Sequence, residues 1–235
     1  MALPVLDTPK HSCVLPSTGE TVTYRPFLVG EQKVLLVAQE SENTNEQISE
    51  MIRLIDICCD DIEANELATI DLEYLFLQLR IKSVGETADV QMECEHCKAP
   101  NKVTVQLDQT IVEEPEQVID HVVKITDTIS IDLKTPSYQI VNSVNLNNSD
   151  DPKVIFEVVS KCINSIIDGD EIHTRDDFSD KELMSFLDSM SMDMFEKIQA
   201  FFVNVKKLKI NGSYDCEKCG ENNSYELMGI GNFFD

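Results

Sequence analysis

Two short segments, MECEHCK at Met92–Lys98 and YDCEKCG at Tyr214–Gly220, decide how this sequence folds. Each holds two cysteines separated by two residues, and each lies inside a segment whose polar and apolar residues alternate. Alternation with a period of two predicts β-strands, so each Cys-x-x-Cys motif is expected at the turn of a β-hairpin. One such motif alone does not separate a redox pair from half of a metal site. The second motif makes the two interpretations distinguishable.

Two hairpin tips with two cysteines each offer the donor set of a zinc ribbon, in which four thiolates surround one ion at about 2.3 Å. The four predicted ligands are Cys94, Cys97, Cys216 and Cys219. Gly220 follows the second motif and suits the left-handed backbone that ends such a turn, whereas Lys98 holds the equivalent position in the first. His96 lies between two cysteines and is expected to point away from the metal. A closed four-cysteine site has no open coordination position, so the zinc is predicted to be structural.

The long separation of the two motifs does not exclude the site. Closing a loop of roughly 120 residues costs about 4 kcal/mol, whereas structural zinc contributes roughly 10 to 16 kcal/mol at neutral pH. Hairpins that close without metal remain an alternative. Redox activity is another, although a redox motif normally lies at a helix N-terminus after a strand. Disulfides within the motifs are disfavoured in a cytosolic protein, where thiols stay reduced.

The composition limits the possible partners. Among the 235 residues, 43 are Asp or Glu and 19 are Lys or Arg, which gives a formal net charge of −24. Such a charge repels a phosphate backbone, so we expect no nucleic-acid binding, and a zinc-ribbon transcription or nucleic-acid-associated factor is kept only as the alternative function. No segment approaches the ~20 apolar residues of a membrane span, and the first residues lack a basic region followed by an apolar run. We therefore expect a cytoplasmic protein that binds other proteins.

No arrangement typical of an enzyme is found. The histidines are scattered, with no Ser-His-Asp or Cys-His setting, and no glycine-rich phosphate loop is present. Acidic segments such as EEPEQ at 113–117 are interpreted as solvated surface. A redox enzyme that uses one Cys-x-x-Cys pair is the second rival, but we predict that the protein is not an enzyme.

The remaining sequence predicts an α+β fold. Alternating segments near residues 11–27 indicate an N-terminal β-hairpin, and those at 121–136 indicate another pair of strands. Apolar residues at helical spacing predict helices over 30–41, 44–59, 70–83, 150–168, 179–190 and 192–205. Three parts follow: an N-terminal β-hairpin plus helical region at 1–85, a ribbon-like module of paired hairpins at 86–112 and 206–235, and an α-rich insertion between them at 113–205.

The chain ends in an apolar segment, MGIGNFFD. Phe233 and Phe234 are expected to dock either on the protein's own core or on a neighbour, so they are predicted as partner-binding residues.

Several segments resemble a known family: LPSTGETVTYRPFLVGEQKVLLVA at 15–38, YLFLQLRIKSVGE at 74–86 with the hairpin after it, IDLKTPSY at 131–138, and the closing CEKCG and GIGNFFD. Over residues 14–234 the chain resembles the T-even-type baseplate protein family of contractile-tailed bacteriophages. This family includes the small baseplate hub and hub-assembly proteins. The sequence departs from the family pattern in its first Cys-x-x-Cys turn and its acidic centre.

The resemblance implies a virus-encoded, non-enzymatic protein made in the host cytoplasm. Such a protein would act in virion morphogenesis, at tail assembly, by helping to build the central hub of the baseplate. It would either remain in the virion as a subunit or act as a chaperone-like assembly factor. Its expected partners are other baseplate hub proteins of the phage.

Overall fold

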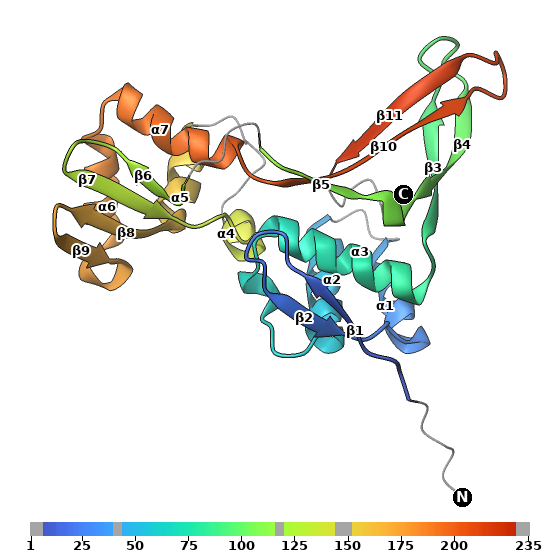
Figure 1. The fold of residues 1–235 in the computed structure, drawn as a ribbon, viewed down its shortest axis with the longest axis horizontal. Coiled ribbons are helices and arrows are strands. Elements are labelled where there is room, and N and C mark those ends of the chain that lie inside the picture. The colour runs from blue at the N-terminus through green and yellow to red at the C-terminus, as the bar shows by residue number, and fades with distance from the viewer. Residues whose placement is uncertain (1–6, 40–43, 116–119, 144–151, 229–235) are drawn as a thin grey trace, which may run out of the picture. The chain divides into compact units, whose positions relative to one another are not determined.

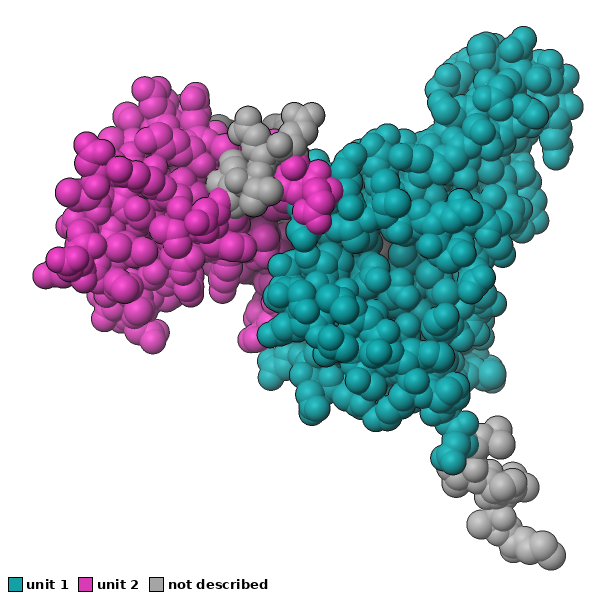
Figure 2. All heavy atoms as spheres, viewed as in Figure 1, with its two compact units in different colours: residues 1–64, 70–113, 206–235 teal, residues 65–69, 114–205 magenta. Residues whose placement is uncertain are grey.

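The computed structural model describes residues 7–39, 44–115, 120–143 and 152–228 (Figure 1). It contains both helices and strands, which confirms the α+β class. The chain divides into two compact units: unit 1 comprises 1–64, 70–113 and 206–235, and unit 2 comprises 65–69 and 114–205 (Figure 2). The three-part division expected from the sequence stays a prediction. Within the described ranges, no helix is both long enough and apolar enough to cross a bilayer.

Unit 1 begins with the expected N-terminal hairpin, β1 (His11–Val14) paired antiparallel with β2 (Thr21–Tyr24). The three expected helices follow, α1 (Val29–Gln39), α2 (Thr44–Cys58) and α3 (Thr69–Ser83), with a short 3₁₀ turn, η1 (Ala64–Glu66), before α3. Helix α3 is buried on several sides, through Leu72, Leu75, Phe76, Leu77, Leu79 and Ile81. A helix with apolar contacts around most of its circumference lies inside a fold, so α3 is the central element of this part of unit 1.

One buried carboxylate attaches the N-terminal hairpin to α3. Asp71, in the first turn of α3, is only 1% exposed. Its carboxylate accepts a hydrogen bond from the backbone N–H of Ser17 (2.8 Å) and another from the Ser17 hydroxyl. Ser17 lies in the turn between β1 and β2. Burial raises the pKa of Asp71, although the Ser17 hydrogen bonds partly oppose this shift.

Two longer hairpins complete unit 1. Strands β3 (Thr87–Glu93) and β4 (Pro100–Gln106) pair antiparallel along their whole length. Strands β10 (Lys207–Asp215) and β11 (Asn222–Met228) form the second hairpin, and β5 (Ile111–Glu113) joins the free edge of β10. Both expected Cys-x-x-Cys turns lie between paired strands, one at residues 94–99 and one at 216–221. The η2 turn (Leu107–Gln109) separates β4 from β5.

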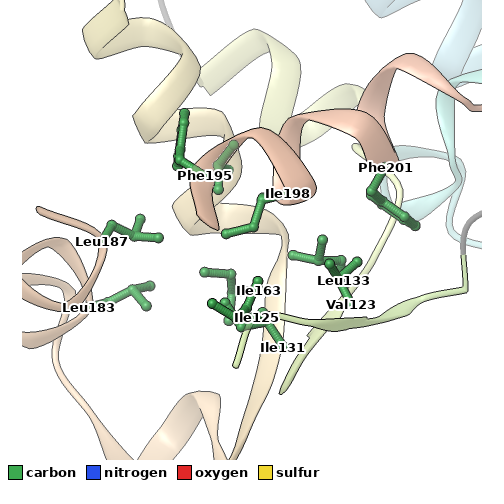
Figure 3. Packing of buried hydrophobic residues seen from close by; sticks show 11 residues of the cluster. Val123, Ile125, Ile131, Leu133, Ile163, Leu183, Leu187, Phe195, Ile198 and Phe201 are labelled. Carbon is green, nitrogen blue, oxygen red and sulfur yellow. The ribbon is translucent and has the colours of Figure 1, made fainter. Parts of the chain in front are cut away.

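Unit 2 is a four-stranded antiparallel sheet with helices. Its strand order is β6-β7-β8-β9, with β6 (Val122–Lys124), β7 (Ile129–Leu133), β8 (Ile163–Asp168) and β9 (Glu171–Thr174). The other elements are α4 (Tyr138–Ser143), α5 (Pro152–Cys162), η4 (Arg175–Asp177), α6 (Asp180–Asp188) and α7 (Met192–Val203). Side chains of α6 and α7 meet those of the sheet in one apolar cluster, which includes Ile131, Leu183 and Ile198 (Figure 3). A capping box formed by Ser179 and Glu182 is present at the start of α6.

The helix expected over 150–168 is wrong in its last six residues. Helix α5 ends at Cys162, and β8 begins at the next residue. Along β8, Ile163 and Ser165 are buried while Asn164 between them is exposed, so the burial has the period of a strand. Isoleucine fits a pleated sheet well, and pairing with β7 and β9 supplies hydrogen-bond partners on both sides. Strand β9 was not expected from the sequence.

Candidate metal centre

The two Cys-x-x-Cys turns have the same backbone hydrogen bonds. In the first turn, the N–H of Cys94 donates to the carbonyl of Ala99 (2.9 Å), and the N–H of Lys98 donates to the carbonyl of Cys94 (2.9 Å). The second turn repeats both bonds, from Cys216 to Glu221 (2.9 Å) and from Gly220 to Cys216 (2.8 Å). Two segments that are far apart in the sequence therefore fold into one conformation.

Both turns end in the left-handed region of backbone conformation, which was expected only at Gly220. Gly220 has φ 75°, and Lys98 has φ 56° at the equivalent position. A residue with a Cβ is disfavoured there by roughly 1 to 2 kcal/mol. The first turn therefore adopts the same shape as the second at an energetic disadvantage.

The four predicted ligands meet at the tips of the two hairpins. The Sγ atoms of Cys94 and Cys219 are 3.7 Å apart, and those of Cys97 and Cys216 are 3.6 Å apart. All four sulfurs lie within 4.8 Å of one another, and all four cysteines are free. Sulfurs at about 2.3 Å from a tetrahedral ion are about 3.8 Å apart, so the donor set fits a four-thiolate metal site. Thiolates favour soft or borderline cations such as zinc.

Backbone amides favour the ionised thiols that a metal requires. The N–H groups of Cys97 and His96 donate to the sulfur of Cys94 and lower its pKa. In the second turn, the N–H groups of Cys219 and Lys218 lower the pKa of Cys216 to about 6. Each turn thus stabilises the thiolate of its first cysteine.

Without a cation, the four sulfurs cannot all carry charge. The Glu221 N–H lowers the pKa of Cys219, but loss of hydration and hydrogen bonds with the other three cysteine sulfurs outweigh it and raise this pKa to about 12. A divalent cation would relieve this repulsion, because opposite charge favours the ionised form. The four-cysteine group is therefore suited to a divalent metal ion.

Two buried asparagines, which the sequence interpretation missed, connect the turns. The Oδ1 of Asn223 accepts a hydrogen bond from the N–H of Glu95 (2.9 Å), and the Oδ1 of Asn101 accepts one from the N–H of Glu217 (2.9 Å). Each asparagine therefore reaches the turn of the other hairpin. The signal was in the sequence, since both motifs read C-E-x-C-x-x-x-N.

The other cysteines have a different environment. Burial raises the pKa of Cys58, Cys59 and Cys162 to about 12, so these thiols stay protonated. His96 is exposed, and the ligand group found among the described residues consists of the four hairpin cysteines. The predicted partner-binding residues Phe233 and Phe234 lie outside the described residues.

Comparison with known proteins gives one match. The model of a protein family described as T4 bacteriophage base plate protein matches residues 8–235. No curated protein and no solved structure gives a significant match.

Proposed function

This chain belongs to the T4 bacteriophage base plate protein family, since the family match covers nearly its whole length, and from that premise we propose that it acts in the base plate hub. It serves there as a hub subunit or as a hub-assembly factor. It works by docking to other hub proteins of the phage and not by catalysis. Assembly takes place in the host cytoplasm, and a subunit would remain in the virion.

We also propose that the four hairpin cysteines hold a structural zinc ion. The observation that supports this proposal is the convergence of four free sulfurs within 4.8 Å. When bound, zinc would neutralise charge among the thiolates and cross-link the two hairpins. Four protein ligands leave no coordination position for a substrate, which supports a scaffold in place of a reaction centre. Elemental analysis of the purified protein is the first check.

Cross-linked hairpins suit docking because a rigid surface loses little conformational entropy when it binds. The described strands of the hairpins carry many exposed residues: β3, β4 and β11 alternate between exposed and partly or fully buried positions, and β10 does so from Asn211 onward. The exposed side chains of these strands could contact partners, while the proposed zinc ion would hold the two tips together. The apolar C-terminal segment is the second proposed contact.

The docking proposal predicts a loss of partner capture when the C-terminal segment is removed. We expect deletion of residues 229–235 to reduce co-purification with co-expressed hub proteins by at least tenfold. The thermal unfolding of the chain should stay unchanged. Replacement of Phe233 and Phe234 by leucine is the matched control, because it keeps the segment apolar and should retain most of the capture.

Two results would contradict docking through this segment: equal capture by the deletion variant, or capture lost together with the fold. Binding to duplex DNA that weakens with added salt, without capture of hub proteins, would favour the nucleic-acid alternative instead. Mass spectrometry of purified virions separates the two hub roles. A stoichiometric subunit is present in the particle, whereas an assembly factor is absent.

A further inference from the structure

We infer that Asn101 and Asn223 are the positioning residues of the metal centre, each crossing from its own hairpin to hold the Cys-x-x-Cys turn of the other. The inference deepens the proposed metal function of the four cysteines and rests on it. Neither asparagine is a proposed ligand. Each acts through the backbone that carries the ligands, and the side chain of Asn223 also donates a hydrogen bond to the sulfur of Cys94.

The crossing is reciprocal, and it joins distant parts of the chain. Asn223 accepts from the Glu95 amide across 128 sequence positions, and Asn101 accepts from the Glu217 amide across 116. Both asparagines are buried: Asn223 is 2% exposed and Asn101 is 4% exposed. The crossed hydrogen bonds themselves are partly buried, and removal of an asparagine side chain leaves the partner amide without its acceptor.

Each asparagine is also fixed to its own turn. The Nδ2 of Asn101 donates to the carbonyl of Ala99 (2.9 Å), and the Nδ2 of Asn223 donates to the carbonyl of Glu221 (2.9 Å). The carbonyls of Ala99 and Glu221 are the same ones that accept the N–H of the first cysteine in each motif. The side-chain amide of each asparagine therefore links the carbonyl that closes its own turn to a backbone N–H in the turn of the other hairpin.

Among the backbone amides of residues 94 to 98, the amide of Glu95 is the one that bonds to a residue of the other hairpin. The Cys94 amide donates to the carbonyl of Ala99, and the Lys98 amide donates to the carbonyl of Cys94. The amides of His96 and Cys97 point at the sulfur of Cys94. The amide of Glu95 remains, and it donates to Asn223.

The second turn repeats this pattern, with the amide of Glu217 donating to Asn101. The amides of Glu95 and Glu217 lie in partly buried hydrogen bonds, so the crossed asparagines complete the pairing of both turns. Because each bond links the two hairpins, the pair sets the distance and register of the tips. The sulfurs lie 3.6 and 3.7 Å apart across the hairpins. These distances match the roughly 3.8 Å between sulfurs that surround one tetrahedral ion.

The test compares Asn101→Ala and Asn223→Ala with Asn222→Ala. Asn222 is the matched control, because it is adjacent to Asn223 but exposed, and its side chain bonds Asp215 on its own hairpin (2.8 Å). Amide hydrogen exchange, resolved by residue, is measured on reduced protein with Zn²⁺ and after chelation. Zn²⁺ affinity is measured by competition with a chelator of known affinity.

We expect a crossed exchange pattern. Asn223→Ala should expose the amide of Glu95, and Asn101→Ala should expose that of Glu217, while Asn222→Ala changes neither. Zn²⁺ affinity should fall about 10- to 100-fold in each asparagine variant, as for other residues that orient metal ligands. In the control it should stay within about twofold, since surface changes have little effect. A merely structural role would expose both turns equally and would not produce the crossed pattern.

Asn223→Asp and Asn101→Asp keep the inference testable if an alanine variant fails to fold. Aspartate keeps the Oδ1 acceptor but loses the Nδ2 donor. We expect these variants to keep the crossed amide protected while Zn²⁺ affinity falls, because a new negative charge lies beside the thiolates. Loss of protection in the aspartate variants would count against the acceptor role.

The inference is overturned if the exposed amide lies on the hairpin of the substituted asparagine, or if neither affinity nor exchange changes. Failure of the proposed metal function looks different. The unsubstituted protein would then bind no Zn²⁺, while the crossed exchange pattern in metal-free protein would still decide the role of the asparagines.

Discussion

The hairpin tips of unit 1 and the core of unit 2 are held together in different ways. The apolar cluster at the tips consists of Cys94, Ala99 and Cys216, with Cys97 packed against them. Unit 2 buries eleven apolar residues in one cluster (Figure 3). Burial of apolar surface stabilises at about 25 cal/mol per Å² and needs no cofactor. The proposed zinc ion would instead hold the four sulfurs of the tips, which repel one another when ionised. The two regions should therefore respond to different perturbations.

Metal removal should give the largest effect and should be confined to one region. Structural zinc is bound with an apparent free energy of roughly 10 to 16 kcal/mol, so chelation or Cys97→Ser should release the two tips. We expect amides of residues 94–99 and 216–221 to lose exchange protection, while the core of unit 2 keeps it. Residue-resolved hydrogen exchange measures both regions in one sample.

Cys13→Ser is the matched control for Cys97→Ser. Cys13 is also a free, partly buried cysteine, but it does not belong to the four-sulfur group. This variant should retain the full zinc content. Equal loss of protection in unit 2 after chelation would break the proposed contrast between the regions.

A cavity made in the core of unit 2 tests whether apolar packing stabilises this unit independently of the metal centre. Ile198 is fully buried in α7, so Ile198→Ala should lower the free energy of unfolding of unit 2 by about 2 to 5 kcal/mol. Zinc content should not change. Met192→Ala, in the same helix but 70% exposed, should cost less than about 0.5 kcal/mol. Denaturant unfolding monitored by hydrogen exchange reports both values, and zinc loss in Ile198→Ala would contradict independent stabilisation.

The smallest expected effect distinguishes the two Cys-x-x-Cys turns from each other. Gly220 and Lys98 occupy equivalent left-handed positions, and a Cβ at Gly220 would have no atom within 4 Å. Gly220→Ala should therefore destabilise its turn by about 1 to 2 kcal/mol through backbone strain alone. Lys98→Gly should stabilise the first turn by about 0.5 to 1 kcal/mol, after the entropy of the unfolded glycine is subtracted. Local amide exchange rates in the zinc-bound protein measure both changes in turn stability. If the two substitutions changed stability in the same direction, the equivalence of the two turns would be contradicted.

Much of unit 1 could be predicted because its signals are local. Alternation placed the four hairpin strands, and the two-residue spacing of the cysteines placed both turns. Gly220 was expected in the left-handed region for the same local reason. The α+β class and the baseplate family were also predicted from the sequence, and both are confirmed.

Unit 2 shows where local signals fail. Residues 163–168 follow a helix without a break, and their apolar residues are compatible with helix or strand. Their conformation depends on pairing with β7, which is about 30 residues earlier in the sequence. Asn101 and Asn223 were missed for a related reason. Each looks like an ordinary hairpin residue until the other hairpin is beside it.

By itself, the sequence determined the family, the two hairpins and the cysteine pair at the turn of each, because turns, strands and spacing are set by neighbouring residues. Only the tertiary structure decided that the sulfurs of one hairpin meet those of the other and that the asparagines cross between them. Cys97 and Cys216 are 119 positions apart, so the crossed hydrogen bonds require the two hairpins to lie side by side. Contacts between such distant residues leave no periodic pattern in either segment alone.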